Sequence, residues 1–160
     1  TSVSRGLGDV YKRQSQAGVK IQLIVRGICC LRPKVKGLSD NITVKSIIGR
    51  FLEHSRIYVF ANGGKFLSDK NIVIMASGDL MPRNLYQRVE TFIPLENETV
   101  RAQVLEQVML ALLKDTSNCW ELQSNGTYIK HKYSETNFSS HIYFMNNPSL
   151  SGLGSLAVPG

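Results

Sequence analysis

Residues 21–33 read IQLIVRGICCLRP, and this stretch decides the predicted fold. Its first five residues contain only one polar side chain, Gln22, which is typical of a strand buried inside a sheet. We therefore predict a strand over residues 19–25. The strand ends at Arg26, which brings a positive charge to the sheet edge, and at Gly27, which allows another group to approach the backbone closely. The rest of the chain should show what Arg26 binds.

Further along the chain, strands and helices are predicted to alternate. Three segments rich in apolar and β-branched residues, each followed by glycine or proline, are predicted strands: residues 56–60, 71–76 and 88–93. A short apolar face predicts a helix over residues 46–53. Residues 97–114 form a longer predicted helix with Asn97 as its N-cap. This order predicts an α/β sandwich in which a central mixed sheet is flanked by helices.

The two ends of the chain differ in composition from the middle. Residues 1–14, TSVSRGLGDVYKRQ, show no sustained periodicity and resemble a translated sequencing-adaptor tail, so we expect them to pack on nothing. Residues 15–131 are predicted to form the domain, with a hairpin at Asn125-Gly126. Residues 132–160 are rich in Ser, Asn and Gly, and they are predicted to form a weakly ordered tail. We therefore expect this chain to be a piece of a longer protein.

The charge of the chain is unevenly distributed. The formal net charge is +7, but residues 15–94 hold 12 basic against 5 acidic side chains, whereas residues 95–160 hold 4 against 6. A basic half attracts polyanions such as nucleic acid, nucleotides or polyphosphate, although a solvated basic face would have the same composition. No apolar run reaches the roughly 18 residues of a membrane span. The three cysteines are few and odd in number, which favours reduced thiols in a cytosolic compartment and provides no metal-ligand spacing.

Polar side chains lie at the ends of several predicted strands. Arg26 follows the first, and both His54 and Arg56 enter the second. Positions two apart point to the same face of a strand, so His54 and Arg56 would lie side by side. A histidine can exchange a proton near neutral pH and a guanidinium can hold two phosphate oxygens, so this pair suits phosphoryl chemistry. Structural interpretations remain open: His54 could cap a helix, and Glu90 could pair with Arg26 or with Arg88.

The chain resembles the C-terminal catalytic domain of bacterial polyphosphate kinases in three long segments. These segments are GVKIQLIVRGICCLRP, NITVKSIIGRFLEHSRIYVFANGG and SGDLMPRNLYQRVETFIP, and the similarity extends from about Ser15 to Tyr128. The resemblance implies the second of two phospholipase D-like α/β domains. It also implies an enzyme that uses magnesium and reversibly moves the terminal phosphate of ATP onto polyphosphate through a phosphohistidine. That histidine and the magnesium ligands are expected in regions of the family outside this chain.

The resemblance also implies roles for individual residues. Arg26 and Arg88 are expected to contact ATP phosphates, and His54 is expected to line the nucleotide site as a proton donor or transition-state partner. Arg56 is a fourth candidate for phosphate binding. The implied partners are ATP, ADP and inorganic polyphosphate, with no specific nucleic acid and no transmembrane segment. The full-length protein is expected to be a cytoplasmic homo-oligomer, with peripheral membrane association left open.

Two other functions are compatible with parts of the sequence. A phospholipase D-like phosphodiesterase or nuclease would need a lysine two positions and an aspartate seven positions after His54, but Arg56 and Ala61 occupy these places. A non-enzymatic polyanion-binding module would explain the basic half, but not the polar residues at the strand ends. A salt titration separates the last case, because purely electrostatic binding weakens steeply with salt and does not distinguish polyanions.

Overall fold

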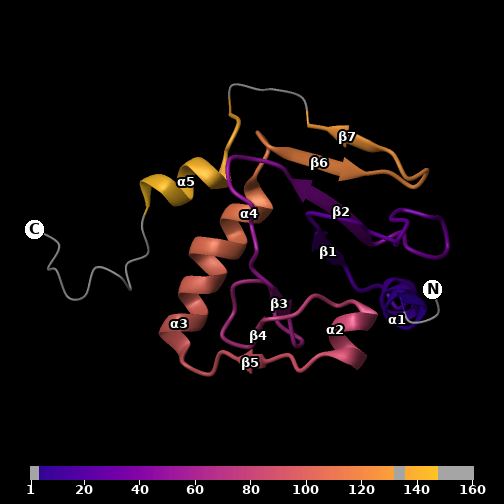
Figure 1. Cartoon of the computed structure of the whole chain (residues 1–160), viewed down its shortest axis with the longest axis horizontal. Helices are drawn as coiled ribbons and strands as arrows, with labels where there is room; N and C mark the ends of the chain where they lie inside the picture. The colour runs from indigo at the N-terminus through magenta and orange to yellow at the C-terminus, as the bar shows by residue number, and fades with distance from the viewer. Residues whose placement is uncertain (1–3, 132–135, 148–160) are drawn as a thin grey trace, which may run out of the picture.

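The computed structural model describes residues 4–131 and 136–147, and its strands form two sheets (Figure 1). The first sheet has the order β1-β2-β6-β7 and the second has the order β3-β4-β5. In the first sheet β1 and β2 are parallel, while β2 pairs with β6 and β6 with β7 in antiparallel fashion. All pairs of the second sheet are antiparallel. The predicted α/β class with a mixed sheet and flanking helices is confirmed, but the strands are divided between two sheets.

Strand β2 (Ile42–Ile47) forms the centre of the larger sheet. It lies between β1 (Ile21–Ile24) and β6 (Cys119–Leu122), and its Ile42 and Val44 are completely buried. The helix predicted for residues 46–53 is wrong, because the chain continues β2 to Ile47 and is irregular from there to residue 56. The alternating pattern ITVKSI allows β2 to pair on both sides, and this pairing overrides the short helical periodicity that follows.

Helix α1 (Ser4–Gln16) covers part of this core. Tyr11 packs against the cluster of Ile42, Val44 and Leu122. Ser15 is buried, and its hydroxyl accepts a hydrogen bond of 3.1 Å from the backbone N–H of Asn41. The expectation that residues 1–14 pack on nothing is therefore wrong for the residues described from 4 onward. One half-buried aromatic side chain and hydrogen bonds at Ser15 and Gln16 attach a helix whose sequence shows little periodicity.

The second sheet consists of β3 (Ile57–Phe60), β4 (Ile72–Ala76) and β5 (Phe92–Pro94). The first two agree with prediction, and the strand predicted at 88–93 is present as β5 but begins later than predicted, because pairing starts only at Phe92. Helix α2 (Pro82–Gln87) occupies the preceding loop. The carboxylate of Glu90 turns toward this loop and accepts hydrogen bonds there, which keeps the preceding residues out of the strand.

The long predicted helix is present as three consecutive helical segments. They are α3 (Glu98–Gln103), a π-helical segment (Val104–Met109) and α4 (Leu110–Lys114). Asn97 is the N-cap, because its side chain accepts a 3.0 Å hydrogen bond from Val100 N–H. The predicted hairpin joins β6 to β7 (Tyr128–Lys130), and Gly126 supplies the positive φ that its turn needs.

Helix α5 (Ser140–Asn146) lies against α4 (Figure 1). Ser140 and His141 are buried, so the prediction of a weakly ordered tail is wrong for this part of residues 132–160. Two hydrogen bonds to the buried carboxylate of Asp115 hold the start of the helix, a long-range contact that composition cannot reveal. Residues 132–135 and 148–160 of the predicted tail lie outside the described residues.

Candidate phosphate-binding site

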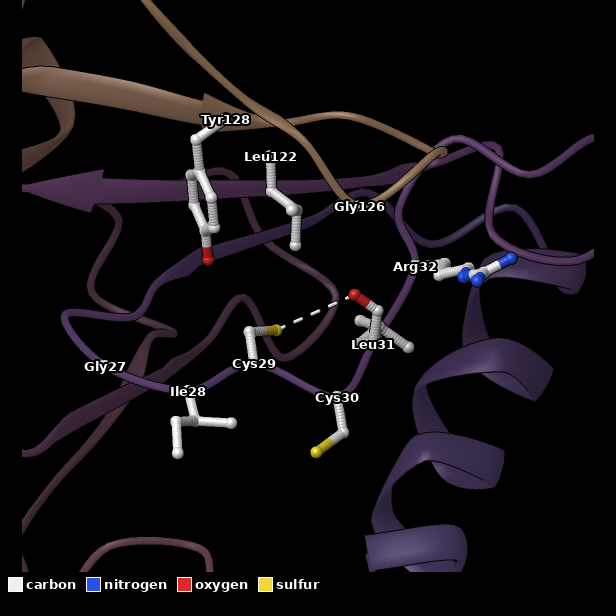
Figure 2. A pocket seen from close by; sticks show the side chains of 9 residues that line it. All are labelled: Gly27, Ile28, Cys29, Cys30, Leu31, Arg32, Leu122, Gly126 and Tyr128. Carbon is white, nitrogen blue, oxygen red and sulfur yellow. Dashed lines mark hydrogen bonds between the residues drawn. The ribbon is translucent and has the colours of Figure 1, made fainter.

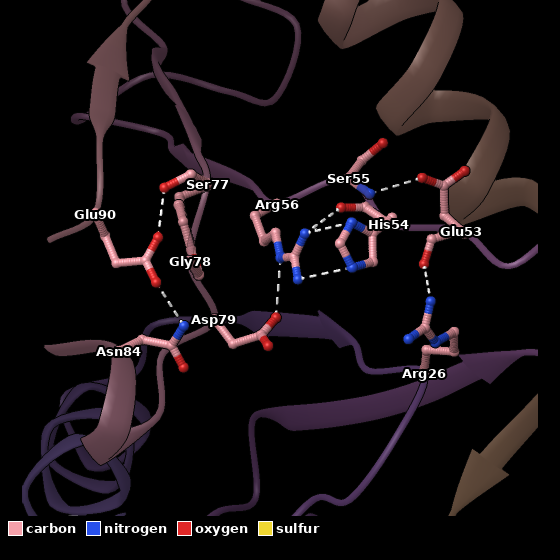
Figure 3. Close-up of polar contacts among 11 residues, drawn as sticks. Arg26, Glu53, His54, Ser55, Arg56, Ser77, Gly78, Asp79, Asn84 and Glu90 are labelled. Atoms are coloured by element: carbon pink, nitrogen blue, oxygen red, sulfur yellow. Dashed lines mark hydrogen bonds and ion pairs between the residues drawn. The ribbon is translucent and has the colours of Figure 1, made fainter. Parts of the chain in front are cut away.

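Arg26 leaves the larger sheet directly after β1. The backbone N–H of Val25 still bonds to Lys45 of β2 at 2.8 Å, and the Ser46 hydroxyl donates to the carbonyl of Arg26 at 3.4 Å. The exposed Arg26 guanidinium donates to the carbonyl of Glu53 at 2.6 Å (Figure 3). Arg26 therefore binds a backbone oxygen next to His54 and not the carboxylate of Glu90.

His54 and Arg56 contact each other directly before β3. Two nitrogens of the Arg56 guanidinium lie 2.7 Å and 3.1 Å from His54 Nδ1 and Nε2, and Arg56 also donates to the carbonyl of His54 at 2.9 Å. The third guanidinium nitrogen, Nε, donates to the carboxylate of Asp79 at 3.0 Å. A neutral imidazole has one nitrogen that accepts and one that carries the N–H, so the guanidinium donates to only one of the two ring nitrogens. His54 itself remains exposed and accessible to a substrate.

Electrostatic interactions stabilise the carboxylates around this pair in their charged form. The hydrogen bond from Arg56 lowers the pKa of Asp79, with further contributions from the charges of Arg56, Arg83 and His54 outweighing partial burial. Burial raises the pKa of Glu53, but hydrogen bonds from Ser55 and the backbone N–H of His54 lower it overall. Both carboxylates are thus anionic at neutral pH and hold the neighbouring donors in place.

Arg88 lies apart from the other three predicted site residues. It is the exposed C-cap of α2, and within residues 4–131 and 136–147 no hydrogen bond or ion pair joins it to Arg26, His54 or Arg56. Its charge acts on Glu90, whose pKa is lowered first by the Ser77 hydroxyl, then by Asn84, and also by the charges of Arg88 and Arg56. The charges of Arg88 and Arg56 therefore both act on Glu90, and this is the connection between Arg88 and the other predicted site residues.

A surface pocket of about 340 Å³ lies directly after Arg26, between the loop that follows β1 and the hairpin β6–β7 (Figure 2). It is lined by Gly27, Ile28, Cys29, Cys30, Leu31, Arg32, Leu122, Gly126 and Tyr128. The thiol of Cys29 points toward the carbonyl of Leu31 at 3.8 Å, whereas the thiol of Cys30 points elsewhere (Figure 2). All three cysteines of the chain are free, and burial raises the pKa of Cys29. The Cys29 thiol is thus protonated and unsuited to act as a nucleophile.

Neither a metal-ligand cluster nor a membrane-spanning helix is found among the described residues. In that part of the chain, no three or more His, Cys, Asp or Glu side chains come close enough to bind a metal ion. The same part of the chain contains no helix with the length and apolarity that crossing a bilayer requires.

Fold and site together define a phospholipase D-like α/β domain with arginines and a histidine at its exposed strand ends. The family model described as "Polyphosphate kinase C-terminal domain 2" matches residues 5–141, so the chain belongs to this family. A polyphosphate kinase of Erythrobacter litoralis is 58% identical over 152 residues, which cover 95% of this chain and 21% of that protein. A polyphosphate kinase of Helicobacter pylori is 48% identical over 130 residues, covering 81% of this chain and 18% of that protein.

A solved structure that matches this chain is also a polyphosphate kinase. The crystal structure of polyphosphate kinase from Porphyromonas gingivalis matches with a TM-score of 0.79 and 36% sequence identity, over 89% of this chain and 22% of that one. The chain therefore spans about a fifth of the length of the relatives it matches. The matched residues 5–141 also include the start of helix α5, which lies beyond the predicted domain end at residue 131.

The structure brings together three of the four predicted site residues. Arg26, His54 and Arg56 are connected through the segment that leads from β2 to β3. Arg88 is related to them through Glu90, whose pKa the charges of both Arg88 and Arg56 lower. Sequence reasoning missed the carbonyl of Glu53 as the partner of Arg26. No sequence signal identifies a backbone oxygen as an acceptor, because every residue has one.

Proposed function

We propose that the whole protein carrying this chain is a polyphosphate kinase that reversibly transfers the terminal phosphate of ATP to inorganic polyphosphate. The observation that supports this proposal is the arrangement around Glu53, whose carbonyl binds Arg26 at 2.6 Å while the next residue, His54, contacts Arg56 at 2.7 Å. Two guanidinium groups and a histidine thus meet at the segment of residues 53–56. This chain would bind the nucleotide and polyphosphate, while the phosphohistidine and the magnesium ligands would come from other parts of the protein.

The proposed role of the arginines is electrostatic. Phosphoryl transfer places negative charge on the three equatorial oxygens, so positive charges that are fixed in advance lower the barrier without reorganisation. Arg56 is fixed by Asp79, and Arg26 is fixed by Glu53. Arg88 would extend the same surface toward the outer phosphates. Residues outside the described part of the chain would hold magnesium, which would add to the stabilisation of the phosphate charge.

The proposed role of His54 is to donate a proton or hydrogen bond to the leaving oxygen. General acid catalysis of this kind contributes about 10²–10⁴ in rate. The ring of His54 is exposed, so it has to give up only its contacts with Arg56 to reach a substrate. His54→Ala should therefore reduce turnover more than it weakens ATP binding.

Steady-state kinetics of the full-length enzyme tests these roles. Arg26→Ala should lower both ATP affinity and turnover, because its contacts are made in the ground state and in the transition state. Arg26→Lys should rescue only partly, since an ammonium cannot make a bidentate contact. Arg101→Ala on α3 serves as the matched loss of a positive charge outside the site. Wild-type turnover in His54→Ala would contradict the assignment of the histidine.

The isolated chain provides a second test. With labelled ATP and magnesium it should form no acid-labile phosphoprotein, since the proposed phosphohistidine lies in another part of the protein. A stoichiometric phosphohistidine on this chain would refute that placement.

Nuclease activity of the full-length protein would support the alternative phosphodiesterase. Binding that weakens with salt equally for DNA and polyphosphate would support the polyanion-binding module. Cytoplasmic location and homo-oligomerisation stay predictions of this proposal.

A further inference from the structure

His141 is the most completely buried of the three histidines, although it is far from the predicted site in sequence. It lies in α5 with 2% of its surface exposed. Its Nδ1 accepts a 3.1 Å hydrogen bond from the backbone N–H of Phe51, and its ring lies 5.5 Å from the ring of Phe51. The C-terminal helix thus contacts the segment that follows β2, across 90 positions of sequence.

The start of α5 is itself firmly attached. The N–H and hydroxyl of Ser140 donate to Asp115 at 2.7 Å and 2.6 Å, and Asp115 is completely buried at the end of α4. The side chain of Asn118 donates to the Ser139 hydroxyl at 3.0 Å. Because these bonds are buried or partly buried, the position of His141 is set by the α4–β6 connection and is not free to follow the segment after β2.

The segment after β2 fits closely around His141. A Cβ atom on Gly49 would lie 2.8 Å from His141 Cε1 and closer still to Nδ1, nearer than side chains can approach. Only a glycine at this position lets the backbone pass over the imidazole ring. The ring therefore meets the segment twice, at Gly49 through contact and at Phe51 through a hydrogen bond.

The same segment carries the proposed phosphate-binding groups. Glu53, two residues after Phe51, presents the carbonyl that binds Arg26, and His54 is the next residue. We propose that His141 is a positioning residue: it holds the segment of residues 49–54 so that Arg26 and His54 are presented together to the phosphates. This inference rests on the proposed function, but it concerns a side chain that touches no substrate.

The test replaces His141 in the full-length enzyme. His141→Leu keeps the bulk and removes the acceptor, and it should lower turnover about tenfold or more, because a displacement near 1 Å costs up to ~10²-fold. His141→Asn keeps an acceptor at the position of Nδ1 and should restore turnover to within about threefold of wild type. Ile142→Ala, an exposed neighbour in α5, is the matched control and should leave turnover unchanged.

Two further measurements separate positioning from a general loss of structure. Hydrogen exchange of a peptide covering residues 49–54 should speed up in His141→Leu and not in His141→Asn, since only the first frees the Phe51 amide. In a double-mutant cycle, His141→Leu should have a smaller effect on turnover once Arg26 is alanine, because both act through the same carbonyl. Additive effects would show that His141 does not act through Arg26.

A comparison of two polar replacements keeps the proposal testable if His141→Leu does not fold. His141→Gln places its oxygen one bond farther out than His141→Asn, so equal turnover and equal exchange in both variants would overturn the proposal. A wild-type enzyme without ATP-dependent polyphosphate synthesis would instead refute the proposed function. In that case the exchange measurement still decides whether His141 holds the segment.

Discussion

The two sheets contain similar apolar residues, but the larger sheet buries five of them in β2 and β6, whereas the smaller sheet buries only Val73 of β4. In the larger sheet Ile42 and Val44 of β2 are completely buried, whereas in the smaller sheet Ile72 of β4 is 43% exposed and Phe92 of β5 is 41% exposed. The larger sheet is covered by α1 and by the loop after β1, which pack on its core. Strand composition alone therefore does not indicate burial, because burial depends on which elements cover each sheet.

The two sheets contribute different residues to the candidate site. Arg26 extends from the well-buried sheet, while Arg56 and Asp79 lie at the ends of strands in the exposed sheet. The segment of residues 48–56 joins the two sheets and carries His54 between the arginines. We expect substitutions in the larger sheet to affect stability most and substitutions at the junction to affect the geometry of the site.

The largest effect should come from emptying the core of the larger sheet. Ile42→Ala should destabilise the fold by about 2–5 kcal/mol, because it removes a fully buried side chain and leaves a cavity. The matched change Ile72→Ala, on the half-exposed β4, should cost less than about 1 kcal/mol. Denaturant unfolding of both variants measures the difference, and equal losses would remove the distinction between the sheets.

A smaller effect is expected at the junction. Gly49→Ala should cost about 1–3 kcal/mol, because its Cβ would overlap the His141 ring and force the ring or the backbone to move. Gly27→Ala is the control, since a Cβ added there would meet nothing within 4 Å. Melting temperatures of the two variants report the difference. A tolerated Gly49→Ala would mean that the segment does not wrap the imidazole.

The packing of α1 on the larger sheet should contribute less to stability than the fit of Gly49 against His141. Tyr11→Ala should destabilise by about 1–2 kcal/mol, which is the share of a half-buried aromatic side chain, or a few degrees in melting temperature. Val10→Ala, at a side chain that is 48% exposed, provides the comparison within the same helix. If both variants melt like the wild-type chain, α1 adds nothing to the core, as the lack of periodicity in residues 1–14 would suggest.

The smallest effect concerns pH and the exposed sheet. Arg56 holds the pKa of Asp79 below its ordinary value of 3.8, so the ionised carboxylate stabilises the fold above that value, and this contribution is lost as pH falls through the lower folded pKa. Asp79→Asn should therefore melt slightly earlier at neutral pH, by the equivalent of about 0.2–1 kcal/mol. The gap should close as the pH falls below 3.8 and through the lower folded pKa, and Asp69→Asn, at an exposed aspartate, is the control. A gap that persists in acid would have another origin.

Much of the fold could be read from local patterns. The strands near residues 21, 57 and 72, the capped helix after Asn97 and the hairpin at Gly126 all follow from features a few residues long. Predictions failed where a distant partner decided the outcome. The segment after Ile47 is irregular because it packs on α5, and the residues before Phe92 leave the strand because Glu90 binds Ser77 and Asn84.

The candidate site divides in the same way. Arg26, His54 and Arg56 could be identified as candidates from their residue types, their places beside predicted strands and their similarity to the family. Their mutual contacts could not, because Arg26 meets a backbone carbonyl 27 positions away and side-chain chemistry carries no information about that acceptor. Arg88 could be identified in the same way, but only the structure shows that it lies at an exposed helix end, apart from the other three.

The family, several of the strands and the set of cationic side chains could be predicted from the sequence, because these depend on residue type and local spacing. The folded structure was needed to show that the strands divide into two sheets, that His141 is buried, and that it contacts the segment presenting Glu53 and His54. These features depend on contacts between residues up to 90 positions apart. Such contacts stabilise the protein only once folding has brought the residues together at the cost of chain entropy.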